Sequence, residues 1–329
     1  MEVCQDIIKN ALSSVRFVIC EEVLCSFDNV YMVGGGVRDI LLGYPVDDLD
    51  FIVSENPESG IEKIRQRLLG LPIVLSIKDD SAFDRYRTHK FFVETADEKI
   101  VIDVVFPRKE FYPSPGSRPE IAKGSLIEDL LRRDFTINSL CLSCSPAEGS
   151  GFIIIDHVGG YRDLLEGNLR VLHELSFRDD PVRIIRGIRF MSRFSFRWES
   201  STELLLRDKK IPDYMAAVSI GRRVAEFCKI AYEPDPIEVI LKIENLNLLS
   251  VILTGARFPS DIRREYEKFM ISIPASGFFK DVPEGSSNLI FLAFVLTCIE
   301  EVHKDDFVNN LTVSRATRRV IREIASSRG

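Results

Sequence analysis

The sequence has no long apolar run and no excess of positive charge, and each absence excludes a class of protein. The longest apolar stretch, around Leu289–Leu296, is far shorter than the roughly 20 residues that a transmembrane helix needs. The N-terminal segment lacks the charged and then apolar pattern of a secretion signal, so a cytoplasmic protein with no membrane partner is expected. The formal net charge of −7 provides no general attraction to nucleic acid, so an RNA partner would require local basic patches.

Cysteine and histidine are too sparse and too scattered for a zinc site. The chain has seven cysteines and four histidines. The one close cysteine pair, Cys141 and Cys144, has neither a second pair nor a histidine at zinc spacing. Reduced, buried thiols are therefore expected.

Residues 31–53, YMVGGGVRDILLGYPVDDLDFIV, form the most informative segment. The pattern predicts a strand, a glycine turn at Gly34–Gly36, a short helix ended by Gly43, and a second strand over Asp48–Val53. Because a strand has a period of two, Asp48 and Asp50 are predicted to point to the same side.

Two adjacent carboxylates repel each other unless a cation lies between them, and Mg²⁺ is the usual occupant of such an oxygen site. Glycines before a helix expose backbone N–H groups that suit phosphate oxygens. Together these features indicate nucleotidyl transfer, with Asp48 and Asp50 as the metal ligands. The alternative is a tight turn next to solvated strand-end charges. A dinucleotide site is not indicated, because Asp39 stands where its third glycine belongs.

The segment from Gly35 to Gly43, followed by Asp48-x-Asp50, resembles the signature of class II tRNA nucleotidyltransferases and bacterial poly(A) polymerases, in the polymerase-beta-like superfamily. The resemblance continues to Phe190. It implies that Asp48 and Asp50 carry two metals, and it places Gly35, Gly36 and Arg38 among the nucleotide-binding residues.

Asp103 lies in an apolar run, Ile100–Val105, where a carboxylate is costly to bury without a cation. The resembling family has a third metal-side carboxylate on a strand at this point, so Asp103 is a candidate catalytic residue. The alternative is a salt bridge to an arginine.

The stretch LRRDFTIN at residues 131–138 resembles a further family motif. Arg133 is a candidate clamp for the triphosphate, and Asp134 a candidate acceptor from the ribose hydroxyl. Asn138 is a candidate brace for this loop. An ordinary ion pair at a helix end is the alternative.

The stretch FRDDPVRIIRGIRF at residues 177–190 carries a second constellation, in which Asp180 and Arg183 lie three residues apart on a predicted helix. A carboxylate accepts from the amino group of cytosine or adenine and a guanidinium donates to the ring, whereas guanine and uracil present the opposite pattern. The resembling family selects C and A in this way. A helix-capping aspartate with an i,i+3 salt bridge is the alternative.

A basic stripe continues from Arg183 through Arg186 and Arg189, and it suits the triphosphate or an RNA backbone. In the family's last motif, which is usually centred on a Glu-Arg pair, Gly221 replaces the glutamate and Arg222 is retained.

The predicted fold is α+β: a polymerase-beta-like palm with a mixed sheet of about five strands and helices on one face, followed by an all-α neck and body. The expected parts are a nucleotidyltransferase palm over residues 1–150, a base-recognising neck over 151–233, and a tRNA-binding body over 234–329. A loop is expected over residues 107–124, which are rich in proline and glycine.

The resemblance implies an enzyme that uses Mg²⁺ to add C and A from CTP and ATP to the 3′ end of tRNA. Addition of adenosine alone and poly(A) synthesis remain open, because those enzymes share every motif above. A CC-only enzyme is disfavoured by the full-length loop at 107–124, and a catalytically inactive RNA-binding relative is disfavoured by the intact carboxylates. Nothing in the sequence indicates an oligomeric state.

Overall fold

The structure is a computed structural model that describes residues 2–3, 5–54, 57–80, 88–145, 151–272 and 287–326. The chain divides into two compact units. Unit 1 comprises Met1–Phe111 with Pro119–Leu172, and unit 2 comprises Tyr112–Arg118 with His173–Gly329. Each unit is described by itself.

Unit 1 is built on a mixed sheet with the strand order β1-β10-β9-β2-β3-β6-β5-β4. Only β3 and β6 pair in parallel, and every other neighbouring pair with a described register is antiparallel. The α+β fold is as predicted. The strands are β1 (Glu2–Val3), β2 (Val30–Val33), β3 (Leu49–Val53), β4 (Val74–Asp80), β5 (Thr88–Thr95), β6 (Lys99–Val105), β9 (Cys141–Ser145) and β10 (Gly151–Ile155).

The prediction of about five strands was wrong, because the sheet has eight strands within the described residues. The additional strands, β1, β9 and β10, extend the edge next to β2. Met32 of β2 pairs with Leu142 of β9, although 110 residues separate them in the sequence. Such a long-range pairing leaves no local periodic signal, so sequence patterns did not reveal it.

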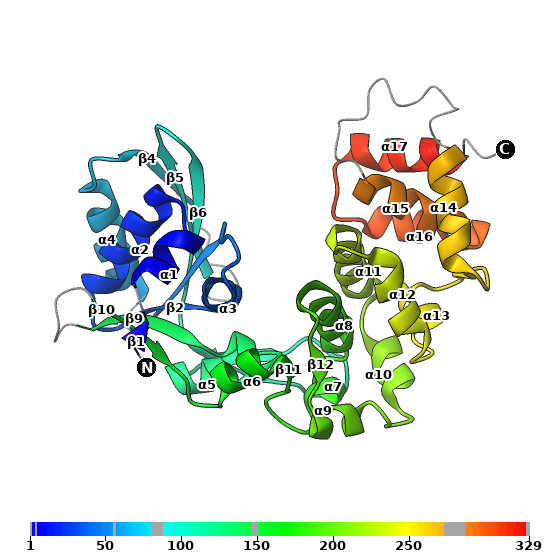
Figure 1. Ribbon diagram of the computed structural model, residues 1–329, viewed down its shortest axis with the longest axis horizontal. Helices are drawn as coiled ribbons and strands as arrows, with labels where there is room; N and C mark the ends of the chain where they lie inside the picture. Colours follow the sequence, from blue (N-terminus) through cyan, green and yellow to red (C-terminus); the bar gives the residue numbers. More distant parts are fainter. Residues whose placement is uncertain are drawn as a thin grey trace. The chain divides into compact units, whose positions relative to one another are not determined.

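One face of the sheet is covered by three helices, α1 (Gln5–Ala11), α2 (Ser14–Cys25) and α4 (Pro57–Leu69), as Figure 1 shows. Gly60 of α4 approaches Val53 so closely that a Cβ atom there would lie 2.7 Å from the valine side chain. Val53 shares its face of β3 with Leu49 and Phe51, which are fully buried. Asp50, between them, must therefore point to the opposite face.

The opposite face carries a smaller apolar cluster formed by Val33, Ile52, Leu130 and Cys141. Leu130 comes from α5 (Leu126–Leu131), which begins with a capping box between Ser125 and Glu128. The remaining elements of unit 1 are α3 (Gly35–Leu42), β7 (Arg108–Phe111), β8 (Glu120–Lys123), η1 (Thr136–Asn138), α6 (Gly160–Glu166) and β11 (Asn168–Leu169).

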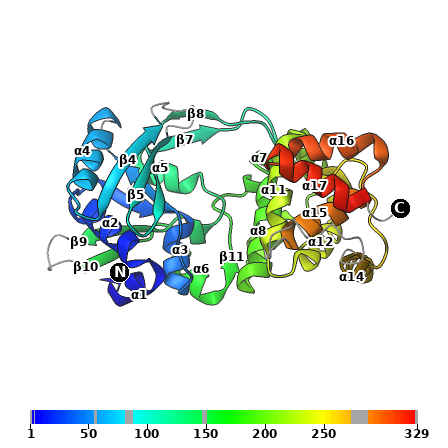
Figure 2. The same cartoon turned by 90° about the horizontal axis from the view of Figure 1, so that it is seen from above.

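The expected loop over residues 107–124 is partly regular structure. β7 and β8 form a two-stranded sheet, as Figure 2 shows. The pair is antiparallel, with Arg108 opposite Lys123 and Phe111 opposite Glu120. Arg108 and Arg132 both contact the carboxylate of Glu110, at 3.0 and 3.1 Å. The ion pair between Glu110 of β7 and Arg132, at the C-terminal end of α5, holds a strand whose polar sequence does not indicate one.

The expectation of reduced thiols was wrong for two cysteines, because Cys25 of α2 and Cys144 of β9 form a disulfide. Helix α2 packs on β9 and brings the two Cα atoms within 5.0 Å across a separation of 119 residues. Cys20, Cys141 and Cys228 are buried free thiols, and burial raises the pKa of each to about 12.

Unit 2 is predominantly helical, with a core that includes Ile184, Ile188, Phe227, Ile240 and Phe291. No helix of the described residues is both long enough and apolar enough to cross a membrane. Its elements are α7 (Ser176–Asp179), α8 (Val182–Phe194), β12 (Arg197–Trp198), α9 (Ser200–Leu205), α10 (Ile211–Ala217), α11 (Ile220–Cys228), η2 (Lys229–Tyr232), α12 (Pro236–Glu244), α13 (Leu249–Ile252), α14 (Ile262–Ser272), α15 (Ser287–Thr297), α16 (Glu301–Asn310) and α17 (Arg315–Ser326).

Candidate active site

A row of charged side chains crosses three neighbouring strands of unit 1. Asp50 of β3 lies beside Asp103 of β6 in the parallel register, and Asp103 lies opposite Lys90 of β5. The Lys90 ammonium is 2.6 Å from both carboxylate oxygens of Asp103. Asp48 precedes β3 and is exposed. The structure therefore brings Asp50 and Asp103 together, and the ion-pair partner of Asp103 is a lysine instead of an arginine.

The electrostatics of Asp50 indicate a site that favours a cation. Burial raises the pKa of the Asp50 carboxyl to about 6, and the negative charges of Asp103 and Asp48 add to this effect. The nearby cations of Arg133 and Lys90 act in the opposite direction, although they do not cancel the rise. A divalent cation at this place would favour the ionised carboxylate.

The glycine turn between β2 and α3 lies against the same row. Gly34 has φ +78°, and a Cβ atom there would lie 3.1 Å from Nη1 of Arg133 and 3.6 Å from Oδ2 of Asp50. Only glycine combines this backbone conformation with so close an approach. The Arg133 guanidinium therefore lies beside the glycine turn and Asp50, where the phosphate-binding role was predicted.

Arg133 is held by the residues that precede and follow it. Its Nη2 donates to the fully buried carboxylate of Asp129 at 3.1 Å, and its Nη1 donates to the carbonyl of Asn138 at 3.4 Å. Within the described residues, its buried Nε has no hydrogen-bond partner. A guanidinium anchored at one end, with a donor still unused, is suited to binding an anion.

Arg38, Asn138 and Asp134 form a buried chain of hydrogen bonds. Arg38 donates to the carboxylate of Asp39 at 2.8 Å and to the side-chain oxygen of Asn138 at 2.7 Å. Asn138 in turn donates to Asp134 at 2.8 Å. The structure thus brings together α3 and the 131–138 motif, with Asn138 bridging the two as a brace.

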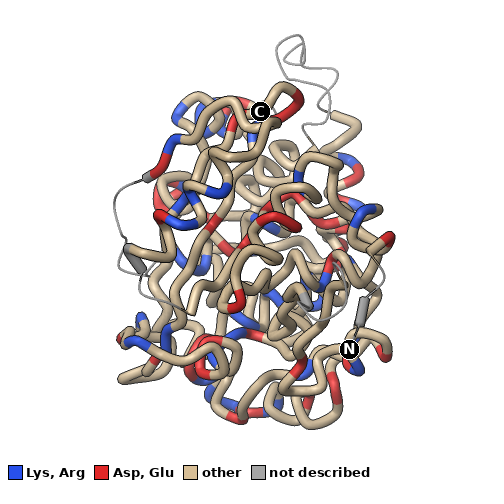
Figure 3. The backbone as a smooth tube through the Cα atoms, turned by 90° about the vertical axis from the view of Figure 1, so that its left-hand side faces the viewer, with Lys and Arg blue, Asp and Glu red and all other residues tan. Residues whose placement is uncertain are grey.

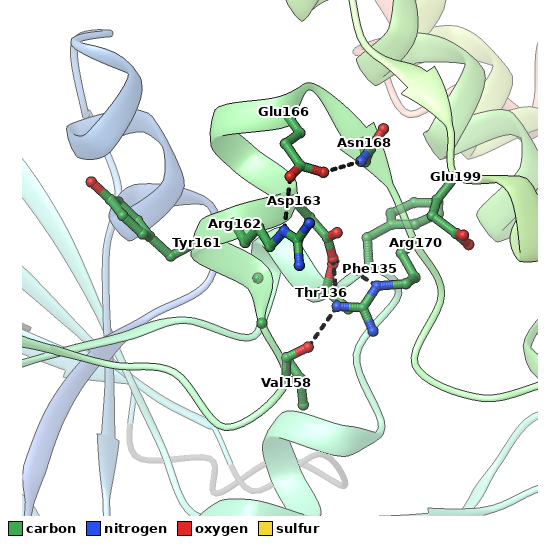
Figure 4. Close-up of polar contacts among 12 residues, drawn as sticks. Phe135, Thr136, Val158, Tyr161, Arg162, Asp163, Glu166, Asn168, Arg170 and Glu199 are labelled. Atoms are coloured by element: carbon green, nitrogen blue, oxygen red, sulfur yellow. Dashed lines mark hydrogen bonds and ion pairs between the residues drawn. The ribbon is translucent and has the colours of Figure 1, made fainter.

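Sequence reasoning missed the residues that support this motif from behind. Thr136 donates to Asp163 at 2.5 Å, and Arg170 contacts both Asp163, at 2.9 Å, and the carbonyl of Val158, at 2.7 Å, as Figure 4 shows. Gly160 must be a glycine, because a Cβ atom there would lie 2.1 Å from the carbonyl oxygen of Thr136.

A further glycine pair, Gly159–Gly160, forms a tight turn. The backbone N–H groups of Val158, Gly159, Gly160 and Tyr161 donate to the carboxylate of Asp156 at 2.9–3.1 Å. An internal carboxylate therefore occupies the place that an external anion would take. The signal in the sequence was an aspartate three residues before a Gly-Gly pair.

In unit 2, the predicted base-selecting residues have partners of their own. Asp180 accepts from Arg222 of α11 at 3.0 Å, and Arg183 of α8 donates to the hydroxyl of Ser176 at 2.6 Å. Arg183 is 4% exposed, so its position is fixed by packing. Nη1 of Arg222 is buried and has no hydrogen-bond partner among the described residues. The sequence analysis placed Arg222 in the family's last motif but did not connect it with Asp180.

The arginine stripe of α8 is not an open basic surface. Arg189 is buried and bridges Glu226 to Glu233, and Arg193 also contacts Glu233, at 2.7 Å. Arg186 is partly exposed and lies 3.8 Å from Glu226. Elsewhere along the chain, basic and acidic positions are interspersed, as Figure 3 shows.

Gly221 lies where α11 meets α16. A Cβ atom at this position would approach the side-chain oxygen of Asn310 to 3.0 Å. The packing of α16 therefore leaves no room for the usual glutamate without a shift of Asn310, while Arg222 and Glu226 keep their contacts to Asp180 and Arg189.

The donor set on β3 fits Mg²⁺. No group of three or more His, Cys, Asp or Glu side chains in the described ranges is arranged to hold a metal ion by itself. Mg²⁺ in phosphoryl-transfer sites is instead bound by one or two carboxylates together with the phosphates of the substrate. Asp50 of β3 and the exposed Asp48 just before the strand are the candidates for such a pair.

Comparison with known proteins bears on the family of the chain. Residues 30–170 match the family model described as the poly(A) polymerase head domain. The chain is 33% identical over 237 residues to an A-adding tRNA nucleotidyltransferase of Halalkalibacterium halodurans, a match that covers 70% of this chain and 52% of that protein. It is 32% identical over 224 residues to a CCA-adding enzyme of Streptococcus mutans, covering 66% and 49%.

Solved structures share the fold over nearly the whole chain. A CCA-adding enzyme in apo form II has a TM-score of 0.75 at 29% identity, covering 98% of this chain and 73% of that one. The Thermotoga maritima CCA-adding enzyme complexed with tRNA has a TM-score of 0.71 at 27% identity, covering 98% and 72%. The chain spans about half the length of the two curated relatives described above.

Proposed function

Because the chain belongs to the class II tRNA nucleotidyltransferase family, we propose that it adds C and A from CTP and ATP to the 3′ end of tRNA. One observation carries the proposal. The carboxylate row of Asp50 and Asp103 lies beside a glycine turn and an anchored arginine, so the groups proposed to bind metal, triphosphate and attacking hydroxyl adjoin one another.

In this proposal Asp48 and Asp50 hold Mg²⁺, which when bound promotes ionisation of the attacking hydroxyl and neutralises charge on the phosphates. Arg133, with the turn at Gly35–Gly36, binds the triphosphate. Asp134, held by Asn138, accepts from the ribose hydroxyl. Arg38 fixes Asn138 and so the relative position of these groups.

The chemical step is a displacement at the α-phosphorus. The 3′-hydroxyl oxygen of the RNA forms a bond to the α-phosphorus and loses its proton, while the bond to the leaving pyrophosphate breaks. Asp103 is placed to assist the loss of that proton or to tune the site, and Lys90 keeps the Asp103 carboxylate in position.

Base selection is proposed for Asp180 and Arg183, with Arg222 orienting the Asp180 carboxylate. Arg186 is proposed to contact the incoming nucleotide, while Arg189, as part of the buried network, keeps α8 in place for that contact. The corresponding division of labour is nucleotidyl transfer in residues 1–150, base recognition in 151–233 and tRNA binding in 234–329, in a cytoplasmic protein.

Adenosine-only addition is the second candidate. Three relatives of this chain, from H. halodurans, Geobacter sulfurreducens and Aquifex aeolicus, are 33–37% identical to it and are named A-adding tRNA nucleotidyltransferases. The relative from Deinococcus radiodurans, at 35% identity, is named a CC-adding tRNA nucleotidyltransferase, and the relative from S. mutans is named a CCA-adding enzyme. Relatives of similar identity therefore include all three specificities.

The test offers tRNA transcripts that end at the discriminator base or at CC, with labelled CTP, ATP or both, and sizes the products on a denaturing gel. Addition of CC and then A supports the complete activity. If only the CC-ending transcript is extended, and only by A, the result supports the adenosine-only candidate. The matched control is Asp48→Asn with Asp50→Asn, which we expect to be inactive. Failure of the wild-type protein to extend either transcript would refute both candidates.

A further inference from the structure

Two apolar side chains lie on the same face of the sheet as the charged row. Side chains alternate along a strand, so Phe92 shares the face of Lys90 on β5, and Val101 shares the face of Asp103 on β6. Phe92 and Val101 are directly opposite each other in the register of β5 and β6. They therefore form the next row of the sheet, about 6.6 Å along the strands from Lys90 and Asp103.

This row is open, whereas the sheet face on the other side of the charged row is covered. The side chains of Phe92 and Val101 are 46% and 38% exposed. Their strands, β5 and β6, nevertheless lie in the interior of the sheet, as can be followed in Figure 1. On the other side of the charged row, Ile52 is fully buried beneath the cluster that contains Leu130. The carboxylates thus lie at the border between a covered and an uncovered part of one sheet face.

The direction of the reaction assigns this open part to the RNA. Arg133 and the glycine turn lie on the β3 side of the row, where the triphosphate is proposed to bind. The attacking and leaving oxygens of phosphoryl transfer are roughly in line. The attacking nucleoside must therefore approach from the β6 and β5 side, which carries Val101 and Phe92.

Charged neighbours fit an RNA strand at this place. Lys78 of β4 is exposed and lies opposite Phe92 in the register, and the exposed Lys99 precedes Val101 by two residues. Glu94 lies near both lysines and contacts Lys99 at 3.4 Å. An exposed aromatic ring flanked by lysines is the usual combination for binding single-stranded nucleic acid, in which the ring stacks on a base.

We propose that Phe92 and Val101 form a platform on which the 3′-terminal base of the RNA stacks, so that its hydroxyl is presented to Asp103 and Asp50. The inference rests on the proposed function and adds the subsite for the primer terminus. Because every base has a π-face, the platform accepts either C or the discriminator base as the chain grows.

The test is a cycle of changes in protein and RNA. Phe92→Ala is combined with a primer whose terminal nucleoside lacks its base, and KM is measured separately for the primer and for the nucleotide. Stacking on an aromatic ring predicts that each single change raises the KM for the primer roughly 5- to 150-fold. Combining the two changes is expected to raise the KM for the primer little beyond either single change. The KM for the nucleotide is expected to stay constant.

Further variants separate stacking from folding. Phe92→Tyr keeps the ring and is expected to behave as wild type, whereas Phe92→Leu keeps apolar bulk without a π-face. With 2-aminopurine as the terminal base, binding to wild-type protein without nucleotide is expected to quench its fluorescence, and Phe92→Leu to reduce the quenching. Leu69→Ala, at the 50% exposed end of α4, is the matched control and should change neither readout.

The outcomes distinguish the two proposals. If the wild-type protein extends the primer but the losses from Phe92→Ala and the missing base multiply, the platform is refuted and the proposed function stands. An unchanged KM for the primer in Phe92→Ala refutes the platform as well. A wild-type protein that extends no primer refutes the proposed function, and the platform with it.

Discussion

The buried carboxylate of Asp129 offers a sharp test of how the site is held together. Its side chain is fully buried and accepts from Arg132 at 2.7 Å, from Arg133 at 3.1 Å, and from the backbone N–H of Arg108 at 3.3 Å. Asp129→Asn keeps the shape but removes the charge and turns an N–H₂ group toward one guanidinium. The two largely buried guanidinium groups of Arg132 and Arg133 then share one fewer hydrogen-bond acceptor.

Removing one partner of a buried ion pair costs about 3–5 kcal/mol, because the other charge is left uncompensated. Arg132 retains Glu110 at 3.1 Å, which places the expected loss near the lower end, at about 3 kcal/mol. Arg133 loses its only side-chain anchor among the contacts described above, so the KM for the nucleotide is also expected to rise. Glu128→Gln, at the exposed neighbouring position of α5, is the matched control. It should change the free energy of unfolding and the KM for the nucleotide far less.

The assay is urea unfolding followed by two signals. The single tryptophan, Trp198, lies in unit 2, so its fluorescence reports that unit, whereas far-UV circular dichroism reports both. Asp129→Asn is expected to shift the dichroism transition and leave the tryptophan transition in place. If Asp129→Asn and Glu128→Gln cause equal small losses, the buried carboxylate is not what holds the two arginines, and the reasoning fails.

Three further predictions follow from other contacts. Asp50→Asn without divalent cations should stabilise the protein above about pH 6 by up to about 3 kcal/mol, because the raised pKa of about 6 penalises the ionised carboxylate in the folded state. That gain should disappear as the pH falls below about 4, and equal stability of variant and wild type at pH 8 would contradict it. Glu233→Gln, which leaves Arg189 and Arg193 without their shared carboxylate, should destabilise unit 2 by about 3 kcal/mol in tryptophan-monitored unfolding, and an unchanged midpoint would contradict it. Reduction of Cys25–Cys144, or Cys25→Ser, should lower the free energy of unfolding by about 2–5 kcal/mol. Alkylation with mass spectrometry should count two additional thiols after reduction of the wild-type protein; an unchanged count would show that the bond does not form.

The sequence predicted what local periodicity encodes and missed what distant pairings create. The alternation in Asp48–Val53 places Asp50 opposite to the buried Leu49 and Phe51, and the structure has that arrangement. The partner of Asp103 depends on the register between β5 and β6, which no local pattern specifies, and it is Lys90.

The same distinction holds for the arginines and cysteines. The spacing of Arg183, Arg186 and Arg189 indicates one stripe of α8, but the acidic residues that bury Arg189 come from α11 and from Glu233, 37 and 44 residues further on. The pairing of Cys25 with Cys144 likewise depends on how α2 packs on β9. Helix-on-sheet and helix-on-helix packing decides these contacts, and a single sequence records neither.

The place of β3 and β6 in the sheet has a consequence for hydrogen exchange. Both strands have neighbours on each side, β2 and β6 for β3, and β3 and β5 for β6, so their amides are paired on both edges. Amides in such central strands exchange only when the surrounding structure opens as a whole, whereas edge strands fray. The carboxylates Asp50 and Asp103 are therefore expected to sit on a slowly exchanging part of unit 1. Heating or denaturant should abolish their chemistry in the same transition in which those amides lose protection.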